Sequence, residues 1–381
     1  MFNSEPLVMI PGPTPVVESI RQAMARQTYG HTYSTFVEIY KECLAGLRQI
    51  FQADHMVVIG GAGTLSMEMA LLNTVKAGEE ILVVTHGVFG DRYVLVAKAL
   101  GIKVDVLSST LGERVPLAKI EERLAAKKYA AMTLTHVDTS SGVMSQPKED
   151  GELAKKYGVL YILDGVCASA GIPEPMKDWG IDIIVTTCQK AFGTPPGLTM
   201  VAFNDKALAR REALGTVPTY YSDWKNWLPI MENPGMYFAT PPVNLILALA
   251  ESVKIILAEG LEARYARHDR IGRSFRAGLA AVGMKLATKD DAVAPTLSVA
   301  LYPAGVDDAA FRAKMENFGV FVAGSLGELK GKAFRVGHMG NICITELVKT
   351  LSSVERALAA VGAKVQPGAA VGAACTEWDK K

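Results

Sequence analysis

Short apolar runs alternate with amphipathic stretches from residue 55 to residue 203, and this alternation restricts the folds open to the chain. Seven runs occur: HMVVIG, EEILVVT, KVDVLS, AAMTLTH, VLYILD, IDIIVTT and LTMVAF. The stretches between them, such as TLSMEMALLNTV and LAKIEERLAAKK, have helical periodicity. Near-continuous apolar runs separated by helices are typical of a parallel sheet covered on both faces. The pattern therefore predicts an α/β domain with a mostly parallel sheet.

The segments on either side of this region have a different texture. Pro11, Gly12, Pro13 and Pro15 predict an extended start rather than a helix. Residues 245–283 read as one long helical region, and shorter strands and helices follow it. The end of the chain is expected to be loosely ordered. The predicted parts are an N-terminal arm, a large domain, a small C-terminal α+β domain and a tail, at residues 1–16, 17–250, 251–364 and 365–381.

Charge and cysteine content favour a cytoplasmic protein that acts on small molecules. Lys plus Arg is 40 and Asp plus Glu is 39, a balance that favours neither nucleic acid nor a membrane surface as a partner. No apolar run approaches the ~20 residues of a spanning helix, and the first residues do not resemble a signal peptide. The five cysteines are scattered and never spaced as C-x-x-C, so we expect reduced thiols and no metal site.

A glycine-rich turn follows the first apolar run, in VVIGGAGTLSMEMA. Gly60, Gly61 and Gly63 let the backbone approach a ligand, and Thr64 is expected to cap a helix whose first N–H groups suit a phosphate. The alternative is a simple strand-to-helix turn. A dinucleotide site is disfavoured because Ser66 stands where the fingerprint has its third glycine. A lone phosphate fits better.

Polar side chains follow two further runs. Asp164 ends VLYILD, where a carboxylate is costly unless it is paired, and the alternative is a helix N-cap. HVDTSSGV places His136, Asp138, Thr139 and Ser140 after another run, where they either bind a ligand or form a turn. Such ends of strands are where ligands bind in open α/β sheets.

Lys190 follows a third run and precedes a loop stiffened by Pro195 and Pro196. Its distance from Asp164 leaves room for one helix and one strand, so the two side chains are expected at the same edge of neighbouring strands. A surface lysine is the alternative. A phosphate turn, a strand-end carboxylate and a strand-end lysine together are what pyridoxal phosphate (PLP) requires. The cofactor interpretation is therefore preferred.

These motifs also carry a family resemblance. CQKAFGTPPG, DGVCASAG and HVDTSSGV together resemble the class V aminotransferases of PLP fold type I, especially the alanine–glyoxylate and serine–glyoxylate (or serine–pyruvate) branch. The resemblance extends from IPGPTPV to FRVGHMG, with Cys188 in place of the family's serine.

The resemblance implies a role for each cofactor-site residue. Lys190 would form the Schiff base and move the substrate proton, and Asp164 would bind the pyridinium nitrogen. Val166 and Phe89 would pack on the two ring faces, and Thr139 would lie on the side of the phenolic oxygen. The expected phosphate ligands are Gly63, Thr64 and Gln189, completed from the neighbouring subunit by Tyr237 and Thr240.

The resemblance further implies a homodimer with shared active sites, in which Arg335 clamps the substrate carboxylate. The N-terminal PGPT would lie near the substrate. For His31 and Tyr33, a place at the border of the pocket and a place outside it are equally expected. For His338, a structural role and a role in the site are equally expected.

The implied activity is ping-pong transfer of an amino group from alanine or serine to glyoxylate or pyruvate. One alternative is a lyase or desulfurase of the same fold, which needs a cysteine on a mobile loop near the site. Another is a non-catalytic, hydrogenase-associated homologue, against which an intact Lys190, Asp164 and Arg335 argue.

Overall fold

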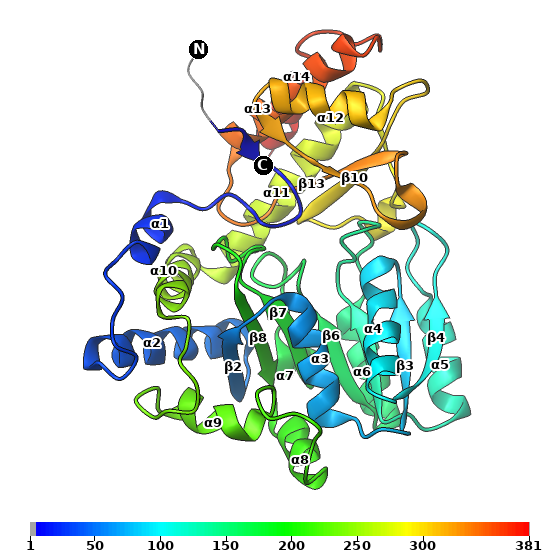
Figure 1. Cartoon of the computed structure of the whole chain (residues 1–381). Coiled ribbons are helices and arrows are strands. Elements are labelled where there is room, and N and C mark those ends of the chain that lie inside the picture. The colour runs from blue at the N-terminus through cyan, green and yellow to red at the C-terminus, as the bar shows by residue number, and fades with distance from the viewer. Residues whose placement is uncertain (1–4, 381) are drawn as a thin grey trace.

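The large domain is built on a seven-stranded sheet that matches the seven apolar runs (Figure 1). The computed structural model describes residues 5–380. The strand order is β2-β8-β7-β6-β5-β3-β4. The strands are β2 (His55–Gly60), β3 (Glu80–Thr85), β4 (Lys103–Ser108), β5 (Ala131–Thr135), β6 (Leu160–Asp164), β7 (Ile183–Thr187) and β8 (Leu198–Phe203). All residues of β5, β6, β7 and β8 are buried, as their apolar sequences predict.

The sheet is mixed because β8 runs antiparallel to both of its neighbours, whereas the other pairs are parallel. The connection from β7 to β8 covers only residues 188–197, and a parallel crossover needs about a dozen or more residues. The prediction of an α/β fold with a mostly parallel sheet is confirmed. Since β6 and β7 are adjacent, the ends of these strands bring Asp164 and Lys190 to one edge.

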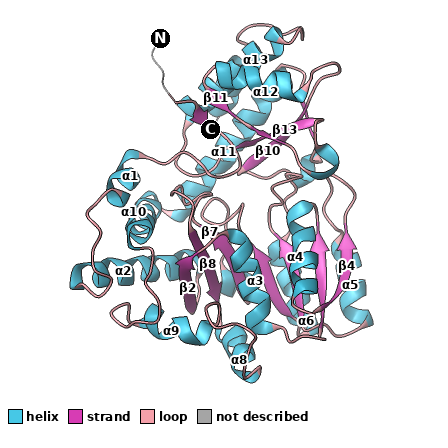
Figure 2. Ribbon diagram, viewed as in Figure 1, coloured by secondary structure: helices cyan, strands magenta, loops and turns pink. Residues whose placement is uncertain are grey.

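Two groups of helices cover this sheet (Figure 2). α3 (Gly63–Thr74) packs against β7 and β8, and α4 (Val88–Ala99) packs against β3, β4 and β5. α5 (Leu117–Ala126), α6 (Pro147–Tyr157) and α7 (Met176–Trp179) contact one another in chain order. Further helices complete the domain: α1 (Glu18–Met24), α2 (Ser34–Phe51), α8 (Asp205–Ala213), α9 (Trp224–Glu232) and α10 (Val243–Glu259).

The small domain has its own antiparallel sheet, in the order β12-β13-β10-β9, and its own apolar core. Its strands are β9 (Lys285–Leu286), β10 (Leu297–Leu301), β12 (Ala323–Gly324) and β13 (Ala333–Gly337). Its helices include α11 (Leu261–Ala281), α12 (Asp308–Asn317) and α13 (Ile344–Ala360). Figure 1 shows α11 running from the large domain up into the small one.

One sequence prediction about the C-terminal half is confirmed and another is wrong. The long helical region over 245–283 is present, but it consists of two helices because it breaks at Gly260, whose φ of 83° lies in the left-handed region. The segment expected to be loosely ordered forms α14 (Ala369–Trp378), which packs on α11 and buries Ala370 and Ala374. The Glu355 carboxylate accepts hydrogen bonds from the backbone N–H groups of Gly368 and Ala370.

The N-terminal arm joins the small domain and then turns toward the large one. β1 (Leu7–Val8) pairs in parallel with β11 (Val320–Phe321), and the Gly337 N–H donates to the Met9 carbonyl at 3.0 Å. Residues 1–4 of the predicted arm, and residue 381 of the predicted tail, lie outside the described part of the chain. The domain boundaries at residues 16, 250 and 364 stay predictions. Within residues 5–380, no helix combines the length and apolarity needed to cross a membrane.

Candidate active site

A cavity of about 160 Å³ opens where strands β6 and β7 end. Eight residues singled out from the sequence line it: Gly63, Thr64, Phe89, Thr139, Asp164, Val166, Gln189 and Lys190. Gly12, from the PGPT segment expected near the substrate, also lines it. The lining residues that the sequence did not single out are Ala62, Met67, Arg92, Val137 and Thr187. The fold therefore gathers the phosphate turn, the carboxylate and the lysine around one space.

Asp164 contributes a buried carboxylate to this cavity. It ends β6, and its Oδ1 accepts the backbone N–H of Val166 at 2.9 Å. Burial raises the pKa of Asp164 to about 7, although the hydrogen bond from Val166 and the charge of Lys190 act in the opposite direction. A cationic hydrogen-bond donor beside this carboxyl group would stabilise its ionised form.

Lys190 is held by the N-terminal arm. Its Nζ donates to the Pro11 carbonyl, and the Thr14 hydroxyl donates to the Lys190 carbonyl at 2.8 Å. Gly12 has a φ of 87°, which favours glycine, and a Cβ there would lie 2.4 Å from the Lys190 Cδ, so a larger residue would displace the lysine side chain. The expected proximity of the PGPT segment to the site is thus present on the lysine side.

The start of α3 forms the end of the cavity suited to an anion. The first N–H groups of a helix have no intrahelical acceptors, and the helix dipole there favours negative charge. The expectation that Thr64 caps this helix is wrong, because Ala62 occupies the N-cap position and Thr64 lies within the first turn. The Thr64 hydroxyl instead accepts a hydrogen bond from Arg92 Nη1 at 3.0 Å. Gln189 lies beside this end, where its Oε1 accepts from the Thr187 hydroxyl at 2.6 Å.

Arg92 is a cation of the cavity that the sequence analysis missed. Its guanidinium carbon lies 4.6 Å from the ring centroid of Phe89, one turn earlier on α4. Among the described residues, no carboxylate lies within 4.0 Å of this guanidinium. The spacing of Phe89 and Arg92 in VFGDR, three residues apart on a helix, is the signal that would have found it.

Asp138 organises the start of α4 rather than the cavity itself. Its Oδ2 accepts the backbone N–H groups of Phe89 at 3.0 Å and Gly90 at 3.1 Å. Its Oδ1 accepts the Ser140 hydroxyl at 2.5 Å, and the Ser140 Oγ in turn accepts the Val88 N–H. The polar turn after β5 therefore fixes the backbone that carries Phe89.

Arg335 lies next to the cavity without lining it. Its Nη1 donates to the carbonyl of Thr139, which does line the cavity, at 3.3 Å, and its Nε donates to the Gly324 carbonyl at 2.9 Å. Burial lowers the pKa of Arg335 below its ordinary value, and no carboxylate of the described residues lies within 4.0 Å of it. Its remaining donor capacity is available to a carboxylate ligand.

Two histidines near the site are structural. His338 is fully buried beside Ser298, whose Oγ lies 2.9 Å from its Nε2, and burial lowers its pKa to about 3. His136 is buried with its Nδ1 2.8 Å from Glu174, which also accepts the Ser169 hydroxyl. Neither residue lines the cavity.

Tyr237 and Thr240 lie on the segment that precedes α10 and do not line this cavity. The Tyr237 side chain is 64% exposed, and its ring centroid lies 5.2 Å from that of His31. Tyr33 is also exposed. None of these four residues lines the cavity of its own chain.

This architecture is the PLP-dependent transferase fold of type I, with a large mixed sheet and a small antiparallel one. The family model for class V aminotransferases matches residues 13–325, and the chain belongs to this family of aminotransferases.

Individual relatives carry several names. Alanine–glyoxylate aminotransferase 1 of Saccharomyces cerevisiae is 34% identical, over 89% of this chain and 93% of the relative. The small subunit of a soluble hydrogenase from Synechococcus is 32% identical over 98% of both chains. The crystal structure of ureidoglycine–glyoxylate aminotransferase from Bacillus subtilis is 25% identical and covers 100% of both chains, with a TM-score of 0.94.

Proposed function

We propose that this aminotransferase binds PLP in the cavity and moves amino groups between a small amino acid and a small 2-oxo acid. PLP is the cofactor typical of the family. The observation that carries the proposal is the meeting of Lys190 and Asp164 in one buried cavity beside a helix start. The residues fit the group: a carboxylate with a raised pKa suits a ring nitrogen, and the start of α3 suits a phosphate.

Nine of the lining residues have a task in this proposal. Asp164 holds a proton on the ring nitrogen, which lets the bound cofactor act as an electron sink. Gly63, Thr64 and Gln189 bind the phosphate, and Arg92 adds a positive charge at the same end. Val166 and Phe89 enclose the ring, and Thr139 lies beside its phenolic oxygen. Lys190 would hold the cofactor covalently, and once the substrate amine has replaced it there, its free Nζ amine would carry the proton that leaves the substrate Cα.

Arg335 is proposed to bind the substrate carboxylate through two parallel hydrogen bonds. Alanine or serine as donor and glyoxylate or pyruvate as acceptor suit a site with one such clamp. The similarity to the yeast alanine–glyoxylate and the Bacillus ureidoglycine–glyoxylate aminotransferases supports glyoxylate as an acceptor. The two substrates use the site in turn, so ping-pong kinetics are expected. Tyr237 and Thr240 are proposed to complete the phosphate site of the partner in a homodimer.

A desulfurase is disfavoured by the state of the cysteines. Cys167 is 1% exposed, and burial raises the pKa of its thiol, so little of the reactive thiolate forms. Cys343 is exposed but serves as the N-cap of α13, where its Sγ lies 3.0 Å from the Glu346 carboxylate. Neither cysteine lies on a loop free to reach a substrate.

The test is the absorption spectrum of the purified protein. We expect a cofactor band that shifts on addition of L-alanine or L-serine, and borohydride treatment that attaches the cofactor to the peptide containing Lys190. Lys190→Ala is expected to lose transamination while retaining cofactor through the phosphate contacts. Full turnover by that variant, or attachment at another lysine, would refute the assignment. A panel of amino donors crossed with glyoxylate, pyruvate and 2-oxoglutarate identifies the substrates.

A further inference from the structure

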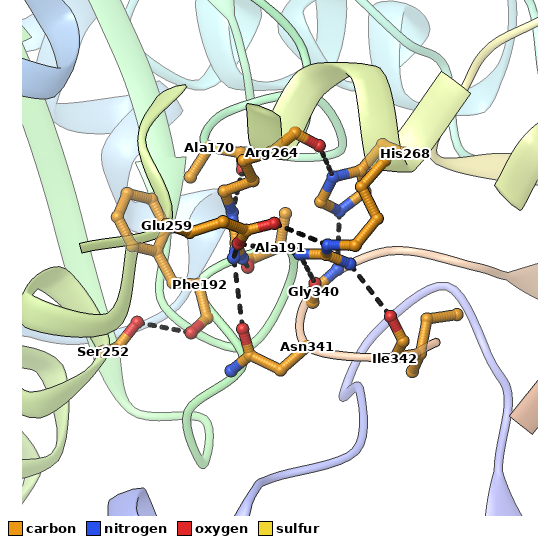
Figure 3. Close-up of polar contacts among 11 residues, drawn as sticks. Ala170, Ala191, Phe192, Ser252, Glu259, Arg264, His268, Gly340, Asn341 and Ile342 are labelled. Atoms are coloured by element: carbon orange, nitrogen blue, oxygen red, sulfur yellow. Dashed lines mark hydrogen bonds and ion pairs between the residues drawn. The ribbon is translucent and has the colours of Figure 1, made fainter. Parts of the chain in front are cut away.

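A polar cluster occupies the junction between α10 and α11 and contacts the loop that follows Lys190 (Figure 3). We call Glu259, Arg264, Arg267, His268 and Ser252 the junction cluster. Glu259 ends α10, and Gly260 breaks the helix, so that the side chains of α11 turn back toward Glu259. The Glu259 carboxylate pairs with Arg264 at 2.8 Å and with Arg267 at 2.6 Å.

Arg264 connects this cluster to two loops of the large domain. Its side chain is fully buried, and burial lowers its pKa to about 10, which leaves it charged at neutral pH. Its Nε donates to the Ala170 carbonyl at 2.7 Å, and its Nη2 donates to the Ala191 carbonyl at 2.6 Å. Ala170 lies in the turn that follows Asp164, and Ala191 directly follows Lys190. The Arg264 guanidinium thus links the two loops that follow Asp164 and Lys190.

Ser252 adds a second support to the lysine loop. Its hydroxyl, on α10, donates to the Phe192 carbonyl at 2.5 Å. Both Ser252 and Phe192 are buried.

Arg267 and His268 connect the same cluster to the small domain. Arg267 Nη1 donates to the Ile342 carbonyl at 2.9 Å, and its Nη2 donates to the Gly340 carbonyl at 3.1 Å. The Gly340 N–H donates to His268 Nε2 at 2.9 Å. Gly340 and Ile342 lie on the loop that follows β13, the strand that carries Arg335.

We propose that the junction cluster is a positioning device that sets Asp164, Lys190 and Arg335 relative to one another through their following loops. This inference rests on the proposed function, because it assigns the loops by the roles of those three residues. The geometry requires arginine: its planar guanidinium directs several N–H groups at fixed angles, whereas a lysine amine serves fewer acceptors at that spacing. Arg264 acts mainly on the lysine side, with one further hydrogen bond from its Nη1 to the Asn341 side chain at 3.2 Å on the loop after β13. Arg267 acts on the carboxylate-clamp side.

This division of labour predicts different kinetic defects in the holoenzyme. Arg264→Lys is expected to lower kcat by at least about tenfold while the KM for the amino acid stays within about twofold, because a misplaced Lys190 slows proton transfer. Arg267→Lys is expected to raise that KM by about fivefold or more, with a smaller change in kcat. The cofactor absorption band should be altered in Arg264→Lys and normal in Arg267→Lys.

Arg211→Lys is the matched control for loss of a buried arginine. Arg211 is 1% exposed and binds Asp223 and the Gly215 carbonyl, and its contact with Asn73 is at the end of α3 remote from the cavity. This control should lose thermal stability while kcat, KM and the band remain at the wild-type values. Identical kinetic losses in the control and the two cluster variants would overturn the proposal, as would wild-type kinetics in both cluster variants.

A milder pair keeps the test decisive if Arg264→Lys does not fold. Ser252→Ala removes the donor to Phe192 and should lower kcat by about threefold or more. Ser353→Ala, which removes a buried donor to the Phe318 carbonyl, should leave kcat unchanged. Equal kcat values in the two serine variants would overturn the proposal. A wild-type protein without a cofactor band would refute the proposed function itself before any variant is compared.

Discussion

At the scale of single residues, the charge of Asp164 depends on what fills the cavity beside it. Its carboxyl group is buried, and its pKa is raised from 3.8 to about 7. A cationic ring nitrogen at hydrogen-bonding distance would lower that pKa again, because an opposite charge favours the ionised form. The binding of PLP and the ionisation of Asp164 are therefore expected to support each other.

A pH titration of stability tests this coupling. In the cofactor-free protein, the folded state keeps a proton on Asp164 that the unfolded chain releases. The resulting contribution to the free energy of unfolding is fully present below pH 3.8 and is lost as the pH rises through about 7. Asp164→Asn should lack this loss. Asp150 also has a raised pKa, of about 8, so the informative quantity is the difference between the two proteins in urea unfolding from pH 4 to pH 8. Parallel curves would contradict the assignment.

Arg335→Ala should weaken amino-acid binding without displacing the cofactor. Loss of a charge-assisted hydrogen-bond pair, worth ~1.5–3 kcal/mol, corresponds to a rise in KM of roughly 10–100-fold. Lys332→Ala is the control, since Lys332 is an exposed neighbour in the sequence, and its KM should not change. An Arg335→Ala protein that lost its cofactor band would show that Arg335 has a different role.

At the scale of elements, the break between α10 and α11 depends on the positive φ of Gly260. No atom lies within 4 Å of a Cβ placed there, so alanine would meet no clash. Its only cost would be the backbone strain of a φ of 83°. Gly260→Ala should lower the free energy of unfolding by about 1 kcal/mol. Gly372→Ala in α14, where a Cβ is also unobstructed, should raise it by about 0.5–1 kcal/mol. Denaturant unfolding measures both, and equal signs would contradict this explanation.

The strands were predictable and some helix limits were not, for physical reasons. Buried strands such as β6 and β7 need apolar residues along their whole length, and that requirement is visible in the sequence. The break at Gly260 is hidden because amphipathic sequence continues on both sides of it. α14 was missed because its buried residues are two alanines, Ala370 and Ala374, in a short segment that also contains glycine, a composition that does not mark a helix.

The site was predictable in the same uneven way. Residues at strand ends, such as Asp164 and Lys190, follow from the position of the strands and the chemistry of the side chains. The position of Arg264 could not be predicted, because its main partners are backbone carbonyls, which have no signature in the sequence. Arg92 lies between the two cases, since helical spacing ties it to Phe89.

At the scale of the whole molecule, the proposed shared active site makes a complementation prediction. Lys190→Ala and a Tyr237→Ala, Thr240→Ala double variant should each be impaired alone. Mixed dimers contain one site in which Lys190, Tyr237 and Thr240 are all intact, so unfolding and refolding the two together should restore activity. The control is the same mixture prepared without exchange of subunits. No recovery in proven mixed dimers would show that the sites are not shared.

The pairing of β1 with β11 has a consequence for how the protein is made. Leu7 aligns with Val320, so β1 is able to pair only after the ribosome has synthesised β11, more than three hundred residues later. The large sheet has all its strands by residue 203 and is able to form on the nascent chain before that time. The Pro11 carbonyl reaches Lys190 only after the arm has docked. Assembly of the lysine environment therefore follows the synthesis of β11, well over one hundred residues after Lys190 itself.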